Sequence, residues 1–235
     1  MKQYIKNIWL LLGVLIAELN VFFTGISLIK FSPSSCEDIV KSIFDTGKYK
    51  KQFFWLQFWF ICVFVFFLFV YFNLFSNLLH ETPKYRSIKL YRYGKDKYLR
   101  ECMKKVCYGD LYGIIAMAAG VIVSGAVLAA GGNAISMNVA QCITVGLQFA
   151  KIFFVIALYG SITVYLMLWK NSNFAMCFML CIMFVQLVVE IFTNKVHFLT
   201  YAGTFENVGY IILLMLLNAA VNFLVRRAVK KISLC

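Results

Sequence analysis

The segment "LYRYGKDKYLRECMKKVCYGDLYGIIAMAAGVIVSGAVLAA", Leu90–Ala130, joins a basic stretch directly to an apolar run. Its first 21 residues contain six Lys or Arg residues, whereas the 20 residues of Leu111–Ala130 carry no charge. About 20 apolar residues are enough for a helix to cross the hydrocarbon core of a bilayer. The change from basic to apolar therefore predicts a membrane span that starts at a charged membrane surface.

The composition of the whole chain agrees with this prediction. Of 235 residues, 62% are hydrophobic and only 14% are charged, against about 45–50% and about 25% in soluble domains. No polar stretch is long enough for a separate soluble domain. We expect residues 1–235 to form a single transmembrane domain.

Six apolar stretches have lengths near that of a membrane span, and none alternates as barrel strands do. We therefore predict an all-α integral membrane protein with six transmembrane helices. The predicted spans cover residues 8–29, 53–79, 111–130, 151–169, 174–192 and 208–224.

Lys and Arg are distributed unevenly between the two predicted membrane faces. The N-terminus, the 77–110 loop, Lys170 and the C-terminus together carry 16, and the opposite loops carry six. Cytoplasmic loops are the ones enriched in Lys and Arg. This asymmetry places both termini and the basic stretch in the cytoplasm, and anionic lipids explain the net charge of +13 without nucleic acid.

The fourth apolar run, residues 140–169, has 30 residues and is longer than one span requires. If Lys151 marks the outer membrane interface, residues 138–150 form a separate amphipathic or re-entrant external segment. If the helix is continuous, it is tilted and Lys151 is buried. We expect the first arrangement.

The basic stretch has a helical pattern of its own. Leu99, Met103 and Val106 recur at helical spacing, and Gly94 indicates a turn upstream. This pattern predicts a basic amphipathic helix at the inner membrane surface. Such a helix contacts lipid, or it docks a cytoplasmic partner, which the interleaved tyrosines favour.

Motifs for catalysis are missing from the sequence, so we do not expect an enzyme. No phosphate-binding G-x-x-x-x-G-K-[ST] occurs, no H-E-x-x-H occurs, and none of the eight cysteines forms a C-x-x-C pair. His80 and His197 lie at opposite predicted membrane faces, so they cannot share a metal ion. We expect no catalytic residue, metal or cofactor in this chain.

A few polar residues interrupt the apolar runs. Such residues either form hydrogen bonds between helices or line a substrate path, and the candidates for a path are Glu18, Lys151, Gln186, Asn218 and Asn222. A stripe of small residues, Ala116, Gly120 and Ser124, lets another helix approach the third span closely. Packing within the subunit is the more common reason for such a stripe, and a subunit interface is the alternative.

This layout resembles the small six-span permease subunits of type-2 ABC exporters in Gram-positive bacteria, many of which are linked to antimicrobial-peptide export or immunity. The local match is "RYGKDKY", Arg92–Tyr98, which is similar to the Arg-aromatic-Gly segment of their loop between spans two and three. Lys95 and Asp96 replace the Ser-Arg that is common there.

The resemblance implies a plasma-membrane permease that moves a peptide, lipid-like or hydrophobic substrate. It implies a second permease subunit and a cytoplasmic ABC ATPase that binds the ATP and Mg²⁺. The residues expected to contact the ATPase are Arg92, Tyr93, Gly94, Lys95 and Tyr98. The alternative is a stand-alone immunity or sensor protein that binds a peptide without ATP.

Overall fold

The computed structural model describes residues 34–44, 83–132, 135–136, 138–193 and 197–231, together with Leu19, Phe64 and Tyr71. In these ranges the chain is helical, and its only β-type pairing is an isolated bridge between Ser35 and Ser136. The helices are α2 (Cys36–Phe44), α4 (Pro83–Tyr93), α5 (Lys95–Ala130), α6 (Val139–Trp169), α7 (Ser172–Thr193) and α8 (Thr204–Lys231).

Four of these helices, α5 to α8, are long and apolar enough to cross a membrane. The prediction of an all-helical membrane protein is confirmed to this extent. The predicted spans 8–29 and 53–79 lie outside the described residues, apart from Leu19, Phe64 and Tyr71.

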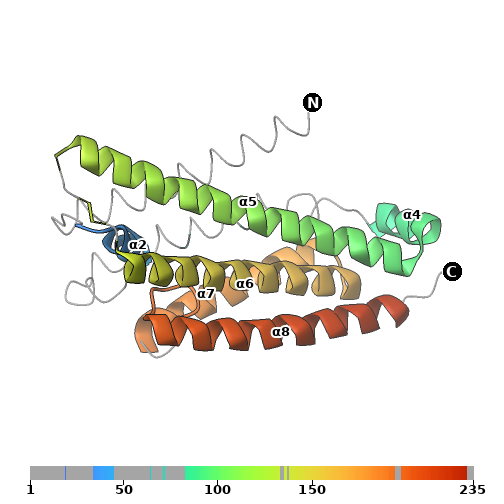
Figure 1. The fold of residues 1–235 in the computed structure, drawn as a ribbon. Coiled ribbons are helices and arrows are strands. Elements are labelled where there is room, and N and C mark those ends of the chain that lie inside the picture. Colours follow the sequence, from blue (N-terminus) through green and yellow to red (C-terminus); the bar gives the residue numbers. More distant parts are fainter. Residues whose placement is uncertain are drawn as a thin grey trace.

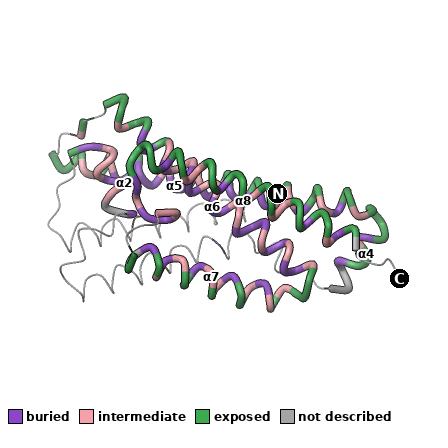
Figure 2. Tube along the Cα trace, turned by 90° about the horizontal axis from the view of Figure 1, so that it is seen from below, coloured by how far each residue is buried: buried purple, intermediate pink, exposed green. Residues whose placement is uncertain are grey.

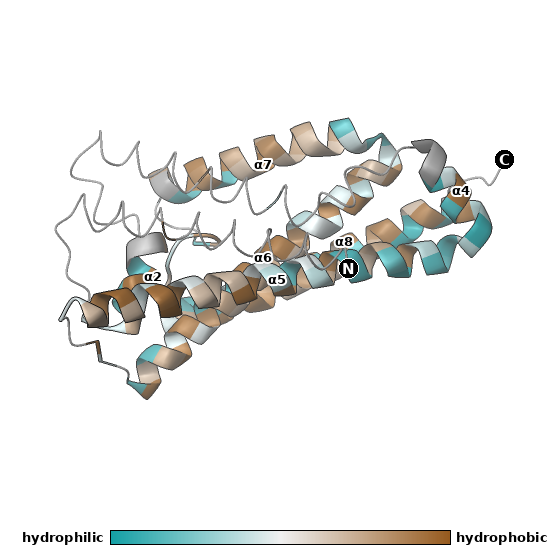
Figure 3. Ribbon diagram, turned by 90° about the horizontal axis from the view of Figure 1, so that it is seen from above, coloured by the Kyte–Doolittle hydropathy of each residue, from teal (hydrophilic) through white to brown (hydrophobic). Residues whose placement is uncertain are grey.

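The long helices run side by side, and the two ends of the bundle differ (Figure 1). One end holds α4, the start of α5 and the end of α8, where the Lys95 ammonium donates to the Lys230 carbonyl at 3.0 Å. The opposite end holds α2 and the α7–α8 connection. In Figure 3, α4 and the first turns of α5 are hydrophilic, whereas the part of α5 near α2 is hydrophobic.

Gly94 separates α4 from α5, as the sequence predicted. Its backbone has φ 77° and ψ 161°, a region that essentially only glycine occupies. The predicted basic helix around Leu99–Val106 is present, but it is not separate from the third span, because α5 continues without a break from Lys95 to Ala130. Tyr98, Cys102 and Val106 are buried at helical spacing on the face that continues into the apolar part of α5.

The predicted division of the fourth apolar run before Lys151 was also wrong. Helix α6 is continuous over 31 residues, and Lys151 is fully buried. Asn138 begins the helix, because its side chain accepts a hydrogen bond from the Ala140 amide and its own amide donates to Gln141. The run stays helical past Lys151 because the bundle supplies partners for the ammonium.

Helix α7 buries one narrow stripe, and the rest of its described surface is half-buried or exposed (Figure 2). The buried positions recur every three or four residues: Ala175, Met179, Met183, Leu187 and Glu190. This is the period of a helix that packs along one line. The last residue of the stripe is Glu190, whose carboxylate lies in the most polar part of the described interior.

Candidate functional site

Lys151 holds the α7–α8 connection from inside the bundle. Its ammonium donates to the carbonyl of His197 at 2.7 Å and to that of Thr200 at 2.8 Å. It also lies 5.7 Å from the centre of the Tyr210 ring, within cation–π range. A buried ammonium needs such partners, because the loss of its water shell without compensation costs on the order of several kcal/mol.

Glu190 holds the same turn from the other side. Its Oε2 atom accepts from the amides of Leu199 at 2.8 Å and Thr200 at 2.9 Å, and from the Thr200 hydroxyl at 3.1 Å. Gln186 donates to Oε1 at 2.9 Å. The carboxylate is fully buried and has several donors, which is what a stable buried charge requires.

The cluster extends toward α6 through two further side chains. The Tyr159 hydroxyl donates to Gln186 at 2.8 Å, and Gln148 donates to the Thr200 carbonyl at 3.4 Å. The backbone of Thr200 therefore lies between Lys151, which binds its carbonyl, and Glu190, which binds its amide. We call Gln148, Lys151, Tyr159, Gln186, Glu190 and Thr200 the buried polar cluster.

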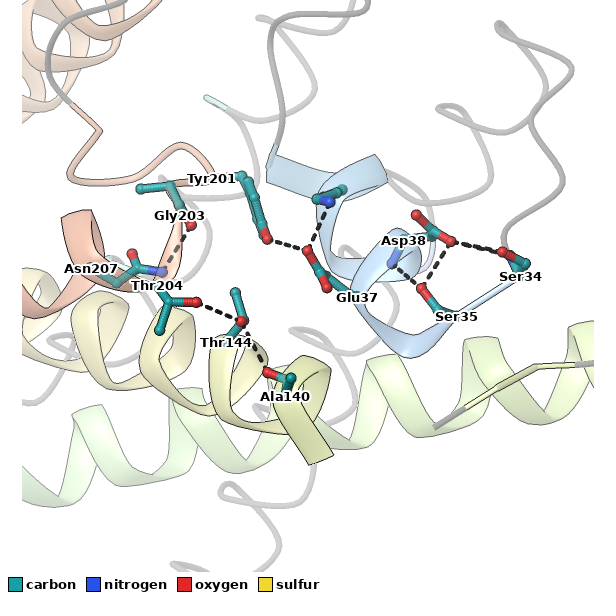
Figure 4. Close-up of polar contacts among 12 residues, drawn as sticks. Ser34, Ser35, Glu37, Asp38, Ala140, Thr144, Tyr201, Gly203, Thr204 and Asn207 are labelled. Atoms are coloured by element: carbon teal, nitrogen blue, oxygen red, sulfur yellow. Dashed lines mark hydrogen bonds and ion pairs between the residues drawn. The ribbon is translucent and has the colours of Figure 1, made fainter. Parts of the chain in front are cut away.

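Helix α2 contacts Tyr201, the residue that directly follows Thr200 of this cluster (Figure 4). The Tyr201 amide donates to the Phe44 carbonyl at 2.9 Å, and the Tyr201 hydroxyl donates to Glu37 at 2.6 Å. Glu37 also pairs with Lys41 at 2.7 Å. The hydrogen bond from Lys41, and next that from Tyr201, hold the pKa of the Glu37 carboxyl below its ordinary value. The α7–α8 connection is thus held on its inner side by Lys151 of α6 and Glu190 of α7, and on its outer side by α2.

The structure separates the predicted path residues into different roles. Lys151 and Gln186 belong to the buried polar cluster. Asn218 lies on α8 and donates to the Phe154 carbonyl of α6 at 3.0 Å, which is a hydrogen bond between helices. Asn222 is half-buried one turn further along α8. Glu18 lies outside the described residues.

The small residues of the third predicted span, Ala116, Gly120 and Ser124, are all buried within the chain. Another subunit therefore cannot contact this stripe unless the bundle rearranges. Their burial accounts for the small side chains through packing inside the subunit.

The segment predicted to contact an ATPase presents two faces. Arg92 and Tyr93 are exposed, whereas Tyr98 is buried. Lys95 points to the end of α8. Tyr91, which the prediction of contact residues left out, is 82% exposed beside Arg92.

Sequence reasoning missed two buried carboxylates, Glu190 and Asp110. Both lie near an end of an apolar run, where a charge is easily assigned to the membrane surface. Asp110 is 1% exposed, and neither of its carboxyl oxygens has a hydrogen-bond partner among the described residues. A rule that treats every acid in or beside a predicted span as a candidate would have found both.

No group of three or more His, Cys, Asp or Glu side chains within the described ranges is arranged to hold a metal ion. The chemistry available to the buried polar cluster is the exchange of hydrogen bonds and charge around a turn of the chain.

The long apolar helices and the polar interior define a helical, multi-pass membrane protein. Comparison of the chain with protein-family models, with curated proteins and with solved structures finds no match. A narrower function has to be argued from the residues of this chain.

Proposed function

We propose that this chain is the transmembrane subunit of an ATP-driven ABC exporter in the plasma membrane of a Gram-positive bacterium. It would act with a second permease subunit and move a peptide, lipid-like or hydrophobic substrate. A separate cytoplasmic ATPase would bind ATP and Mg²⁺. The observation that carries the proposal is the elbow formed by α4, Gly94 and the first turns of α5.

The elbow has the surface that a partner needs. Tyr91, Arg92 and Tyr93 are exposed side by side at the end of α4. Tyr and Arg are the residues that most often dominate binding energy at protein interfaces. Because the predicted spans account for the apolar residues without this segment, exposed tyrosines beside arginine suit a protein interface.

The elbow is also mechanically linked to the interior. Helix α5 runs unbroken for 36 residues, about 54 Å at 1.5 Å per residue. A displacement of its first turn would therefore be carried to the opposite end, where α5 packs against α2 near Gly125 and Ile39. Movement of α2 would in turn act on Tyr201, which leads into the buried polar cluster.

The charge distribution supports the orientation that this mechanism requires. The end with the elbow also carries Lys170, Arg226, Arg227 and Lys230. An excess of Lys and Arg is typical of the cytoplasmic face. The elbow then faces the ATPase, and the buried polar cluster closes the outer end of the path.

The decisive experiment measures ATPase stimulation in a reconstituted complex. We expect Arg92→Lys and Tyr93→Ala each to lower the affinity of the ATPase by about 30-fold, because truncating an interface anchor typically costs about 2 kcal/mol. Lys does not replace the planar, bidentate guanidinium of Arg. Arg227→Lys on α8 and Tyr108→Ala further along α5 are matched controls at exposed positions outside α4 and the first turns of α5.

If both elbow variants stimulate the ATPase as strongly as the wild type, the elbow has no part in the mechanism. A pull-down in mild detergent tests the partner itself. If no ATPase co-purifies with the wild-type chain, the alternative of a stand-alone immunity or sensor protein is favoured.

A further inference from the structure

A basic cleft lies between α4 and the first turns of α5. Its volume is about 380 Å³, within the range of ligand pockets. Three lysines, two tyrosines and a cysteine line it: Lys89, Lys97, Lys105, Tyr93, Tyr98 and Cys102. Glu101 is the only acidic residue among the described lining residues.

The cleft combines an apolar floor with a cationic rim. Tyr98 and Cys102 are 4% and 3% exposed and form the floor. Lys89 and Lys105 are half-buried, and the Lys97 ammonium lies 5.0 Å from the centre of the Tyr93 ring. The cationic rim suits a phosphate, and the apolar floor suits the glycerol and upper acyl groups attached to it.

The position of the cleft favours a lipid over a soluble ligand. Arg86, one turn before Lys89, donates to the Met167 carbonyl in the last turn of the apolar helix α6. Lys105 lies six residues before the apolar run that starts at Leu111, about 9 Å along the helix. The headgroup layer is about 5–7 Å thick on each side of the hydrocarbon core, so Lys105 lies just outside this layer and the cleft opens beside it, with α4 held at the end of α6 by Arg86.

We propose that this cleft binds the headgroup of an anionic phospholipid. The lysines of the rim hold the phosphate, and the floor holds the part of the lipid next to it. Tyr91 and Arg92 do not line the cleft, whereas Tyr93 both lines it and belongs to the proposed ATPase contact, so lipid binding is measured on the protein without the ATPase. Basic pockets between membrane helices bind anionic headgroups by the same electrostatics.

The test compares the lipids retained by the full-length protein after extraction from vesicles of equal parts phosphatidylglycerol and phosphatidylcholine. Native mass spectrometry counts the bound lipids. We expect the wild type to retain phosphatidylglycerol preferentially. The triple variant Lys89→Gln, Lys97→Gln, Lys105→Gln should lose affinity for it by about five-fold per lysine, on the order of a hundred-fold in total.

A matched control distinguishes a site from general surface charge. Arg100→Gln, Lys104→Gln, Arg227→Gln removes three exposed positive charges that do not line the cleft. This variant should keep the preference. Equal losses in the two triple variants would show only diffuse attraction and would overturn the proposal.

Two further measurements keep the proposal open to refutation if the triple variant folds poorly. Glu101→Gln removes the opposing acid and should raise the affinity for phosphatidylglycerol, and a fall would contradict the proposal.

Glycerol 3-phosphate, which has no acyl chains, should compete poorly. Equal binding of glycerol 3-phosphate would assign the cleft to a soluble phosphate and overturn the lipid proposal. If the triple lysine variant keeps its lipid but no longer stimulates the ATPase, the cleft contacts the protein partner, and the lipid proposal is overturned.

Discussion

Lys151 and Glu190 place opposite charges inside an apolar bundle without touching each other directly. Each binds a different group of the Thr200 peptide, so the two charges are joined through the backbone of the α7–α8 connection. Removing one member of a buried charge pair typically costs about 3–5 kcal/mol, because the other charge loses its balance. The turn at 197–200 is therefore stable only when both charges are present.

The first prediction concerns this pair. Lys151→Met and Glu190→Gln should each lower the free energy of unfolding by about 3–5 kcal/mol. The double variant should lose clearly less than the sum, because both changes disrupt the same turn. Thermal unfolding of the purified protein in detergent measures all three.

Lys170→Met is the matched control for the lysine. Lys170 is exposed just after the last residue of the same helix, so its removal should change the free energy of unfolding by no more than about 0.5 kcal/mol. Losses that add fully in the double variant would show that the two charges act independently.

At the scale of single elements, the shape of the elbow depends on Gly94. A side chain at this position would meet no atom within 4 Å, but the positive φ strains any residue other than glycine. The angle between α4 and α5 is therefore set by backbone conformation and not by packing of a neighbouring side chain. Such strain costs about 1–3 kcal/mol in a non-glycine residue.

The second prediction follows from that strain. Gly94→Ala should destabilise the elbow by about 1–3 kcal/mol and weaken ATPase stimulation. Gly146→Ala is the control, because Gly146 lies inside α6 and its added methyl group also meets nothing within 4 Å. Alanine is favoured over glycine in a helix by about 1 kcal/mol, so this variant should be neutral or stabilised. Amide hydrogen exchange over α4 and thermal unfolding report the two effects, and equal behaviour of both variants would contradict the strain argument.

At the scale of the whole molecule, the two ends of the bundle differ. The basic end exposes the charged and aromatic groups that we propose bind lipid and protein, whereas the α2 end closes over a buried polar cluster. Cys107 is exposed on α5 near the basic end, and Cys142 is exposed at the start of α6 near α2. These two cysteines therefore report the orientation of the chain in the membrane.

The third prediction uses variants that keep only one of these cysteines. An impermeant maleimide applied to intact cells should label Cys142 and leave Cys107 unlabelled until the membrane is permeabilised. Cys102 is buried and should label far more slowly than Cys107 after permeabilisation, which makes it the control. Labelling of Cys107 on intact cells would reverse the orientation and rule out a cytoplasmic ATPase at the elbow.

The sequence by itself determined where the helices α5, α7 and α8 lie, to within a few residues except at the start of α5, which begins well before the predicted span, and at the end of α8, which continues to Lys231 beyond the predicted end at residue 224. This was possible because the length of an apolar run is a local property that the bilayer constrains directly. The turn at Gly94 was predictable for a similar reason, since glycine is favoured where the backbone needs a positive φ.

Only the tertiary structure decided the length of α6 and the members of the buried polar cluster. A run of 30 apolar residues with one lysine is compatible with one helix or two segments, and the choice depends on whether the lysine finds partners. Those partners are the carbonyls of residues 197 and 200, more than 45 positions away. Periodicity reports which side of a helix is buried, but it carries no information about which distant backbone group will be there. The bundle packing brings them together, and only that packing makes a buried charge at Lys151 stable.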